Sequence, residues 1–197
     1  MLHKNSFCLA CNVPAFLFAT ALVFFAIANA HAQGHRIAFR HLTIEDGLSQ
    51  SAVYALLQDR QGFVWIGTKD GLNRYDGYHF TIFKNVPSDS NSLSNNYITA
   101  LFEDRRGAIW VGTREGGLNR LEPGSGKFRR FAHSPDDSGS LSNNRISSLA
   151  EDRSGALWIA TDHGLNRLSR EEAAQSRPNF EKFFHAANDI QSLSGNI

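Results

Sequence analysis

The sequence is built around one stretch, Asp59-Arg60-Gln61-Gly62-Phe63-Val64-Trp65-Ile66-Gly67-Thr68-Lys69-Asp70-Gly71-Leu72-Asn73-Arg74, which returns twice in altered form. The other copies run over Asp104–Arg120 and Asp152–Arg167, and each copy holds one tryptophan. These tryptophans are 45 residues apart (65 to 110) and 48 residues apart (110 to 158). A period in the forties predicts an array of similar structural units.

Each copy has the features of a short β-hairpin. Residues Phe63–Ile66 are apolar, aromatic and β-branched, which favours a strand. Asp59 can accept hydrogen bonds from the backbone that follows it, and Gly62 can adopt the positive φ of a tight turn. Both faces of the strand are apolar, so both need cover. In a β-propeller, blades that stack face to face supply this cover.

The sequence therefore predicts an all-β propeller. We expect blades at residues 47–92, 93–140 and 141–192, and the truncated start of a fourth at 193–197. Four strands are predicted in each blade: 52–58, 63–68, 72–75 and 79–84; 97–103, 108–113, 118–121 and 128–132; 145–151, 156–161, 165–168 and 180–184. A short helix is predicted at 170–175. A propeller needs at least about four blades to close, so we expect an incomplete ring.

Two segments precede the first blade. Residues 1–32 have the features of a secretory signal: Lys4, a charge-free apolar run over Val13–Ala28, and small-x-small patterns at 28–32. The run is slightly short for a bilayer span, which favours a cleaved signal peptide over a membrane anchor. Residues 33–46 are predicted to contain a strand, over 36–46, that could close the ring.

Composition narrows the function. The 197 residues are 42% hydrophobic with a formal net charge of +1, which indicates a globular protein without the concentrated basic charge typical of nucleic-acid binding. The two cysteines, Cys8 and Cys11, lie in the N-terminal segment, and we interpret them as part of it instead of a redox or metal pair. The eight histidines show no metal-binding spacing, and no hydrolase, P-loop or kinase signature occurs. No cofactor or metal is predicted.

The pattern D-x-x-G-x-x-W-[I/V]-[G/A]-T, followed by G-L-N-R, resembles the two-component regulator propeller repeat, as do the linkers Ser92–Asn96 and Ser140–Asn144. The chain departs from the pattern at Ala160, at the inserted Gly116 and in the longer connection Ser169–Asn179. The resemblance implies part of a ring, often seven-bladed, in the periplasmic sensor region of a membrane-anchored histidine kinase or, alternatively, a diguanylate cyclase. It also implies a small-molecule or oligosaccharide ligand and a homodimeric parent whose other blades and output domains are its partners.

Features repeated in every copy are best explained by a structural requirement that every blade shares, such as a capped turn or a packed junction. We interpret the repeated acids as turn caps in preference to catalytic acids or metal ligands, and the tryptophans as inter-blade packing in preference to sugar-stacking platforms. The repeated glycines close the turns. These structural residues are Asp59, Gly62, Trp65, Asp104, Gly107, Trp110, Asp152, Gly155 and Trp158.

Features that differ between copies are better functional candidates. Because strands alternate in direction, the loops between second and third strands share one rim with the blade-to-blade linkers. A rim of amide, acidic and basic groups suits a hydroxyl-rich ligand. A solvated, charge-balanced rim is the alternative, and a polysaccharide-acting enzyme or a protein-docking scaffold are the rival functions. The rim candidates are Lys69, Asp70, Asn95, Asn96, Arg114, Glu115, Asn143, Asn144, Asp162 and His163.

Overall fold

The computed structural model describes residues 38–195. The chain divides into two units, Met1–His41 and Leu42–Ile197, and the second holds all the regular secondary structure described here. The predicted signal segment at residues 1–32, with Cys8 and Cys11, lies outside the described residues. Within residues 38–195, no helix is long and apolar enough to cross a membrane.

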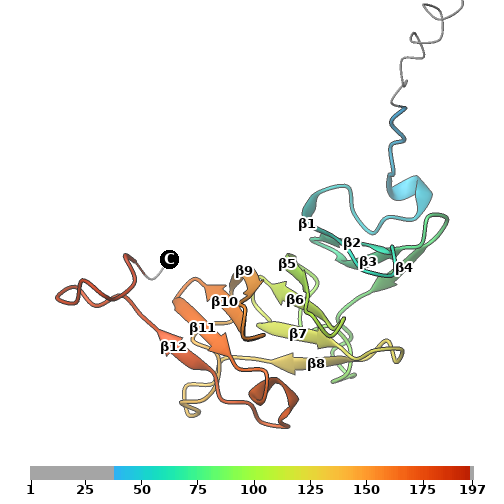
Figure 1. The fold of residues 1–197 in the computed structure, drawn as a ribbon. Helices are drawn as coiled ribbons and strands as arrows, with labels where there is room; N and C mark the ends of the chain where they lie inside the picture. The colour runs from blue at the N-terminus through green and yellow to red at the C-terminus, as the bar shows by residue number, and fades with distance from the viewer. Residues whose placement is uncertain (1–37, 196–197) are drawn as a thin grey trace, which may run out of the picture. The chain divides into compact units, whose positions relative to one another are not determined.

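In the described part of the chain, twelve strands form three antiparallel sheets of four (Figure 1). Each sheet keeps its strands in chain order, and every strand agrees with its predicted range to within one residue at each end. The first sheet has β1 (Val53–Gln58), β2 (Val64–Thr68), β3 (Gly71–Tyr75) and β4 (Phe80–Phe83); the second has β5 (Ile98–Glu103), β6 (Ile109–Thr113), β7 (Leu118–Leu121) and β8 (Phe128–Phe131); the third has β9 (Ile146–Glu151), β10 (Leu157–Thr161), β11 (Gly164–Leu168) and β12 (Glu181–Phe183).

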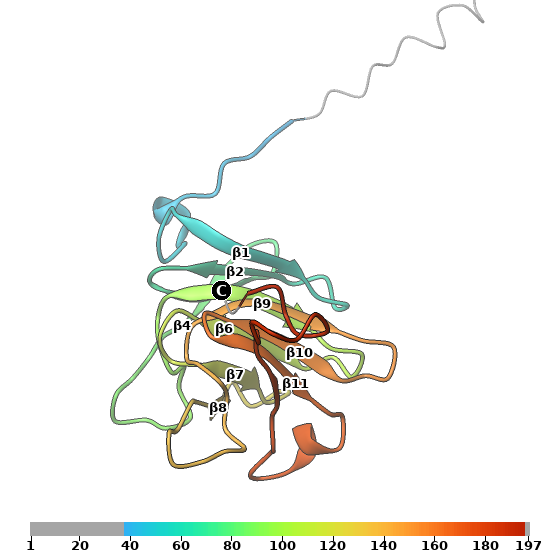
Figure 2. The ribbon, with the colours of Figure 1, turned by 90° about the vertical axis from the view of Figure 1, so that its left-hand side faces the viewer.

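The sheets are arranged as propeller blades. Strands β1, β5 and β9, the first of each sheet, contact one another in sequence, and the turned view in Figure 2 shows the sheets stacked face against face. Each first hairpin carries a register shift at the same place, which in the first sheet makes Tyr54 the extra residue of a bulge. A bulge re-aims its extra side chain. The predicted all-β propeller fold is confirmed.

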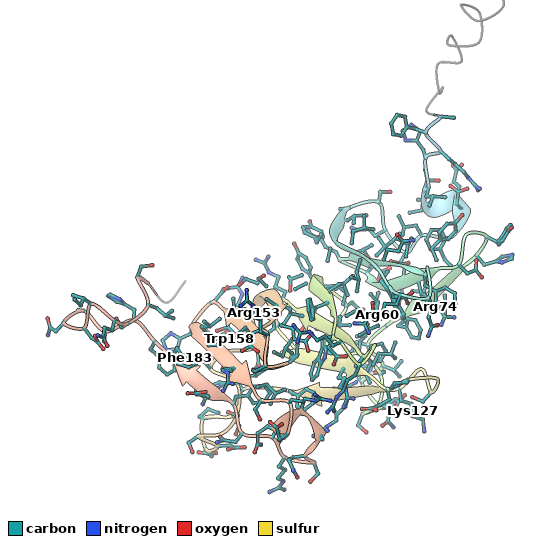
Figure 3. All side chains as sticks on the ribbon, viewed as in Figure 1. Arg60, Arg74, Lys127, Arg153, Trp158 and Phe183 are labelled. Atoms are coloured by element: carbon teal, nitrogen blue, oxygen red, sulfur yellow. The ribbon has the colours of Figure 1, made fainter. Side chains whose placement is uncertain are left out.

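Two apolar clusters hold the blades together, and each crosses one junction. The first joins Trp65 and Leu72 of the first blade to five buried side chains of the second. The second joins Trp110 and its neighbours to the third blade. Trp65 and Trp110 are 3% and 1% exposed, which confirms that they pack between blades. Trp158 lies beside Phe183 (Figure 3), at a ring distance of 5.4 Å, and is only half-buried.

Two glycines permit the close approach of the blades. A Cβ added to Gly67 would lie 2.6 Å from Cγ2 of Ile98, and one added to Gly112 would lie 2.6 Å from Cγ2 of Ile146. Glycine is therefore needed at these positions for space and not for a turn. The third copy has Ala160 at this position.

The predicted strand over residues 36–46 is wrong for its described part. Residues 38–43 have no regular structure, and Ile44–Asp46 form a 3₁₀ helix, η1. Thr43 accepts a hydrogen bond from the Glu45 amide (3.2 Å), and the Asp46 carboxylate accepts one from the Thr43 amide (2.9 Å). Local side-chain bonds of this kind compete with a strand, and here they hold a turn. The predicted helix at 170–175 is a 3₁₀ helix, η2 (Glu172–Ala174).

The junctions predict unequal costs for two equivalent substitutions. We expect Trp110→Ala to lower the free energy of unfolding by about 3–5 kcal/mol, because a large buried side chain is lost. Trp158→Ala should cost clearly less in this chain, because the Trp158 side chain is less deeply buried than that of Trp110. Urea denaturation of both variants measures the difference, and equal losses would contradict the packing described here.

Candidate functional site

The repeated acid has two tasks in each blade. Oδ1 of Asp59 accepts hydrogen bonds from the amides of Gln61 (2.9 Å) and Phe63 (3.0 Å), which confirms its role as a turn cap. Oδ2 accepts a third bond, at 2.7 Å, from Nε1 of Trp65. The sequence did not predict this bond, although the constant six-residue spacing between acid and tryptophan in all copies carries the signal.

The same unit recurs in the other blades. Nε1 of Trp110 donates to Asp104 and Nε1 of Trp158 donates to Asp152, both at 2.9 Å. A guanidinium group lies over each indole, at 5.9 Å for Arg74, 5.6 Å for Arg120 and 5.9 Å for Arg167. The carboxylates of the repeated acids thus accept hydrogen bonds from the turn backbone and from the tryptophan side chain. Trp65 and Trp110 are buried and have little contact with solvent. This arrangement disfavours metal-binding and sugar-stacking roles.

A buried polar network in each blade fixes the incoming linker. In the third blade, Oδ1 of Asn166 accepts from the Ser142 amide (2.8 Å), and its Nδ2 donates to the Ser142 hydroxyl (2.7 Å). That hydroxyl also bonds the hydroxyl of Thr161 (2.9 Å). Asn73 and Asn119 make the equivalent bonds to serines. Sequence reasoning missed this role, although the G-L-N-R repeat carries the asparagine in every copy.

The predicted rim loops do come together. The Gly71 amide donates to the Asn96 carbonyl (2.8 Å), and the Gly117 amide donates to the Asn144 carbonyl (2.9 Å). In the first and second blades, the loop between the second and third strands therefore lies against the linker that enters the next blade.

The four rim asparagines use their side-chain oxygens to hold backbone. Oδ1 of Asn95 and of Asn143 each accepts from the amide two residues later, both at 2.8 Å. Oδ1 of Asn96 accepts from the Asn85 amide (2.6 Å), and that of Asn144 accepts from the His133 amide (2.7 Å). These oxygens already hold the backbone of the linkers, so the side-chain orientations of the four asparagines are set by the fold.

The rim acids have local partners of their own. Asp70 accepts from Nζ of Lys84 at 2.7 Å, and Asp162 pairs with Nε of Arg145 at 3.2 Å. The ring of His163 lies 5.3 Å from that of Phe184. Glu115 is exposed. Asp70 and Asp162 are thus paired with basic groups of the protein. The basic rim residues Lys69 and Arg114 are therefore the next candidates for ligand binding.

Lys69 and Arg114 gather around two tyrosines. Nζ of Lys69 lies 5.7 Å from the ring of Tyr54 and 5.5 Å from that of Tyr97, and the Arg114 guanidinium lies 5.1 Å from the Tyr97 ring. The two rings meet edge to face at 4.8 Å. Hydrogen bonds from Tyr97 and Lys69 lower the pKa of the Tyr54 hydroxyl. We call Tyr54, Tyr97, Lys69 and Arg114 the tyrosine cluster.

Sequence reasoning found the two cations of the tyrosine cluster but missed its aromatic residues. Tyr54 is the bulge residue of β1, and Tyr97 directly precedes β5. A signal was available, because neither tyrosine is repeated: the copies have Thr99 and Ser147 in place of Tyr54. Among residues 38–195, no group of three or more His, Cys, Asp or Glu side chains is placed to hold a metal ion.

Comparison with known proteins identifies the repeats. The family model described as "Two component regulator propeller" matches residues 47–70, 92–115 and 140–163, one segment in each blade. The three blades carry two-component regulator propeller repeats. Each matched segment runs from the linker through the first two strands to the rim loop, so it contains the Asp–Trp unit and the linker serine.

Relatives of these regulator propeller blades occur in large signalling proteins. Over 77 residues the chain is 43% identical to histidine kinase P4 of Formosa agariphila, a match that covers 39% of this chain and 6% of the relative. The extracellular domain of BT3049 from Bacteroides thetaiotaomicron, assigned to the hybrid two-component systems, aligns with a TM-score of 0.69 and 28% identity. That alignment covers 80% of this chain and 21% of the other. The extracellular domain of BT4673, with the same assignment and organism, aligns at 0.61 and 29%, over 77% and 19%.

The acid of the third blade predicts a pH dependence of stability. Hydrogen bonds from the Ser154 side chain and from Trp158 hold the pKa of Asp152 well below its usual range. A depressed native pKa means that the ionised form stabilises the fold above the ordinary pKa of about 3.9, and that this stabilisation is lost as the pH falls further. At pH 7, Asp152→Asn should therefore be less stable than the parent, and the gap should close in acid.

Urea denaturation between pH 7 and pH 2 measures this gap. Asp136→Asn is the matched control, because Asp136 is exposed and its removal changes the net charge equally. A gap that stays constant through acid would contradict the role given to the Asp152 carboxylate.

Proposed function

We propose that these blades are part of a ligand-sensing propeller in the extracytoplasmic region of a membrane-anchored two-component signalling protein. The match to regulator propeller repeats and the likeness to extracellular domains assigned to hybrid two-component systems support this proposal. The histidine kinase relative favours a kinase over a diguanylate cyclase as the output. The sequence features of a secretory signal agree with a periplasmic location.

The tyrosine cluster is the part of the rim best suited to bind a ligand. Two partly exposed aromatic rings offer an apolar face, and the Lys69 ammonium and Arg114 guanidinium groups offer donors beside it. This combination fits a hydroxyl-rich small molecule such as an oligosaccharide. On the described rim, the structural requirements of a blade account for the asparagines, Asp70 and Asp162, but they do not account for the tyrosine cluster.

The pairing of the rim acids favours binding over catalysis. A glycosidase-type mechanism needs two carboxyl groups that face the substrate. On the described rim, Asp70 and Asp162 each have a basic partner, which leaves Glu115. We infer that ligand binding shifts the population of two states of a homodimeric parent, which requires different affinities for the two states.

The test combines a ligand screen with rim variants. A panel of neutral and acidic oligosaccharides is screened by calorimetric titration against the chain, and Tyr54→Ala and Lys69→Gln/Arg114→Gln are then titrated with the tightest binder. We expect at least one class to bind and each variant to weaken binding about tenfold, which corresponds to about 1.4 kcal/mol. Tyr54→Ala removes an aromatic face, and the double variant removes two charged donors.

Lys127→Gln is the matched control. Lys127 is exposed beside β8, in the turn between third and fourth strands, away from the rim loops (Figure 3). Unchanged affinity in both rim variants would exclude the tyrosine cluster as the site. The absence of any oligosaccharide binder would contradict the proposed ligand class.

A further inference from the structure

A groove lies between the second and third blades, on the edge formed by the turns between first and second strands. Its volume is about 210 Å³. Trp110, Leu157 and Leu168 form apolar parts of its lining, and Ala173 and Ala174 at η2 add another. We call it the arginine groove. The turns that line it follow β5 and β9, whereas the tyrosine cluster lies at the opposite ends of the strands, where β1 and β5 begin.

Positive charge is concentrated in the arginine groove. Five guanidinium groups and two carboxylates line it, which gives a local net charge of +3, whereas the whole chain has a net charge of +1. Arginine side chains match carboxylate, sulfate and phosphate groups in shape as well as charge. The charged lining residues are Arg105, Arg106, Arg120, Arg153, Arg170, Asp104 and Glu151.

Both acidic residues of the groove already have hydrogen-bond partners within the protein. Asp104 caps its turn and accepts from Trp110. Glu151 accepts from the Arg105 amide at 3.1 Å, and Nε of Arg105 lies 3.6 Å from it. The same hydrogen bond occurs at the junction of the first and second blades, where the Arg60 amide donates to Glu103. The acids therefore leave most of the arginine charge uncompensated.

Arg120 lacks good acceptors. Its Nε atom is buried and has no hydrogen-bond partner among the described residues. Nη1 has only long contacts, 3.4 Å to the Ala173 carbonyl and 3.9 Å to Glu122. Burial, and then the charge of Arg120, lower the pKa of the neighbouring Arg129. Arg120 thus remains an under-satisfied cation at the edge of the groove.

The equivalent groove between the first and second blades serves as an internal comparison. Its charged lining residues are Asp59, Arg74 and Glu122, with a net charge of −1. Gln61 stands there in place of Arg106, and Pro123 in place of Arg170. A blade junction of this fold therefore needs neither of these two arginines. The η2 wall is likewise specific to the third blade, because a Gly-Ser-Gly turn takes its place in the second.

We propose that the arginine groove binds an oxyanion group, carboxylate, sulfate or phosphate, carried by a small molecule. Arg106 and Arg170 donate to the oxygens of the bound group from the exposed edge of the groove. An oxygen of the same group gives Arg120 the hydrogen-bond acceptor that it lacks. The apolar lining of Trp110, Leu157 and η2 accommodates the body of the molecule. This site is separate from the rim site of the proposed function, and each can fail without the other.

The three tryptophans allow a localised test, because each indole N–H reports on a different blade. Labelled protein is titrated with sodium sulfate, sodium phosphate and sodium acetate, with chloride holding the ionic strength constant, and nitrogen–proton spectra are recorded. We expect a saturable shift of the Trp110 indole and Arg120 Nε signals, with little change at Trp65 and Trp158. The three salts distinguish inorganic anions from a carboxylate as the preferred group.

Variants then test the assignment. Arg106→Gln/Arg170→Gln should weaken binding about tenfold, which corresponds to about 1.4 kcal/mol, because charged donors to the oxyanion are lost. Lys127→Gln/Arg177→Gln removes the same charge outside the groove and should leave the affinity unchanged. Arg170→Gln alone, an exposed change, replaces the double variant if that one does not fold. Parallel shifts of all three indoles, no saturation, or equal effects in both double variants would overturn the proposal.

Discussion

A sheet that is apolar on both faces cannot cover itself, and this constraint governs the structure. Each junction is closed by side chains from two blades, with Trp65 or Trp110 at its centre. The close contact also depends on glycine at positions 67 and 112, where a methyl group would meet an isoleucine of the next blade. Stability therefore depends on neighbouring blades, and a blade at the end of the described stack has one face less well covered, as the half-buried Trp158 shows.

Polar groups decide how the apolar sheets align. The carboxylate of each Asp–Trp unit joins a turn to the indole at the junction, and each buried asparagine joins a linker to its own blade. A buried polar group without a partner costs roughly 1–3 kcal/mol, so these bonds select one alignment over its alternatives. The motif is repeated because every blade has the same polar groups to satisfy. Residues outside this pattern, such as Tyr54, Arg106 and Arg170, are not required by the repeated contacts of a blade.

The sequence predicted the parts that depend on local chemistry. Strand positions, the turn-capping acids and the packing of Trp65 and Trp110 follow from periodicity and turn residues, and the structure confirms them. The strand over 36–46 was wrong in its described part because the side chains of Thr43 and Asp46 form a local cap. The occupied rim asparagines and the unpredicted tyrosines share another cause: their roles depend on which loops meet in space, and that is set by blade stacking.

The most direct test of blade stacking is native-state hydrogen exchange of the 197-residue chain at a concentration where it is monomeric. Exchange of a core amide reports the free energy of the opening that exposes it. Strand β6 of the middle blade is buried throughout, whereas its counterpart β10 is buried only at alternate positions. The account predicts that the β6 amides exchange most slowly and that those of β10 exchange faster. Equal protection of β6 and β10 would show that a blade does not need neighbours on both faces, and would contradict the account.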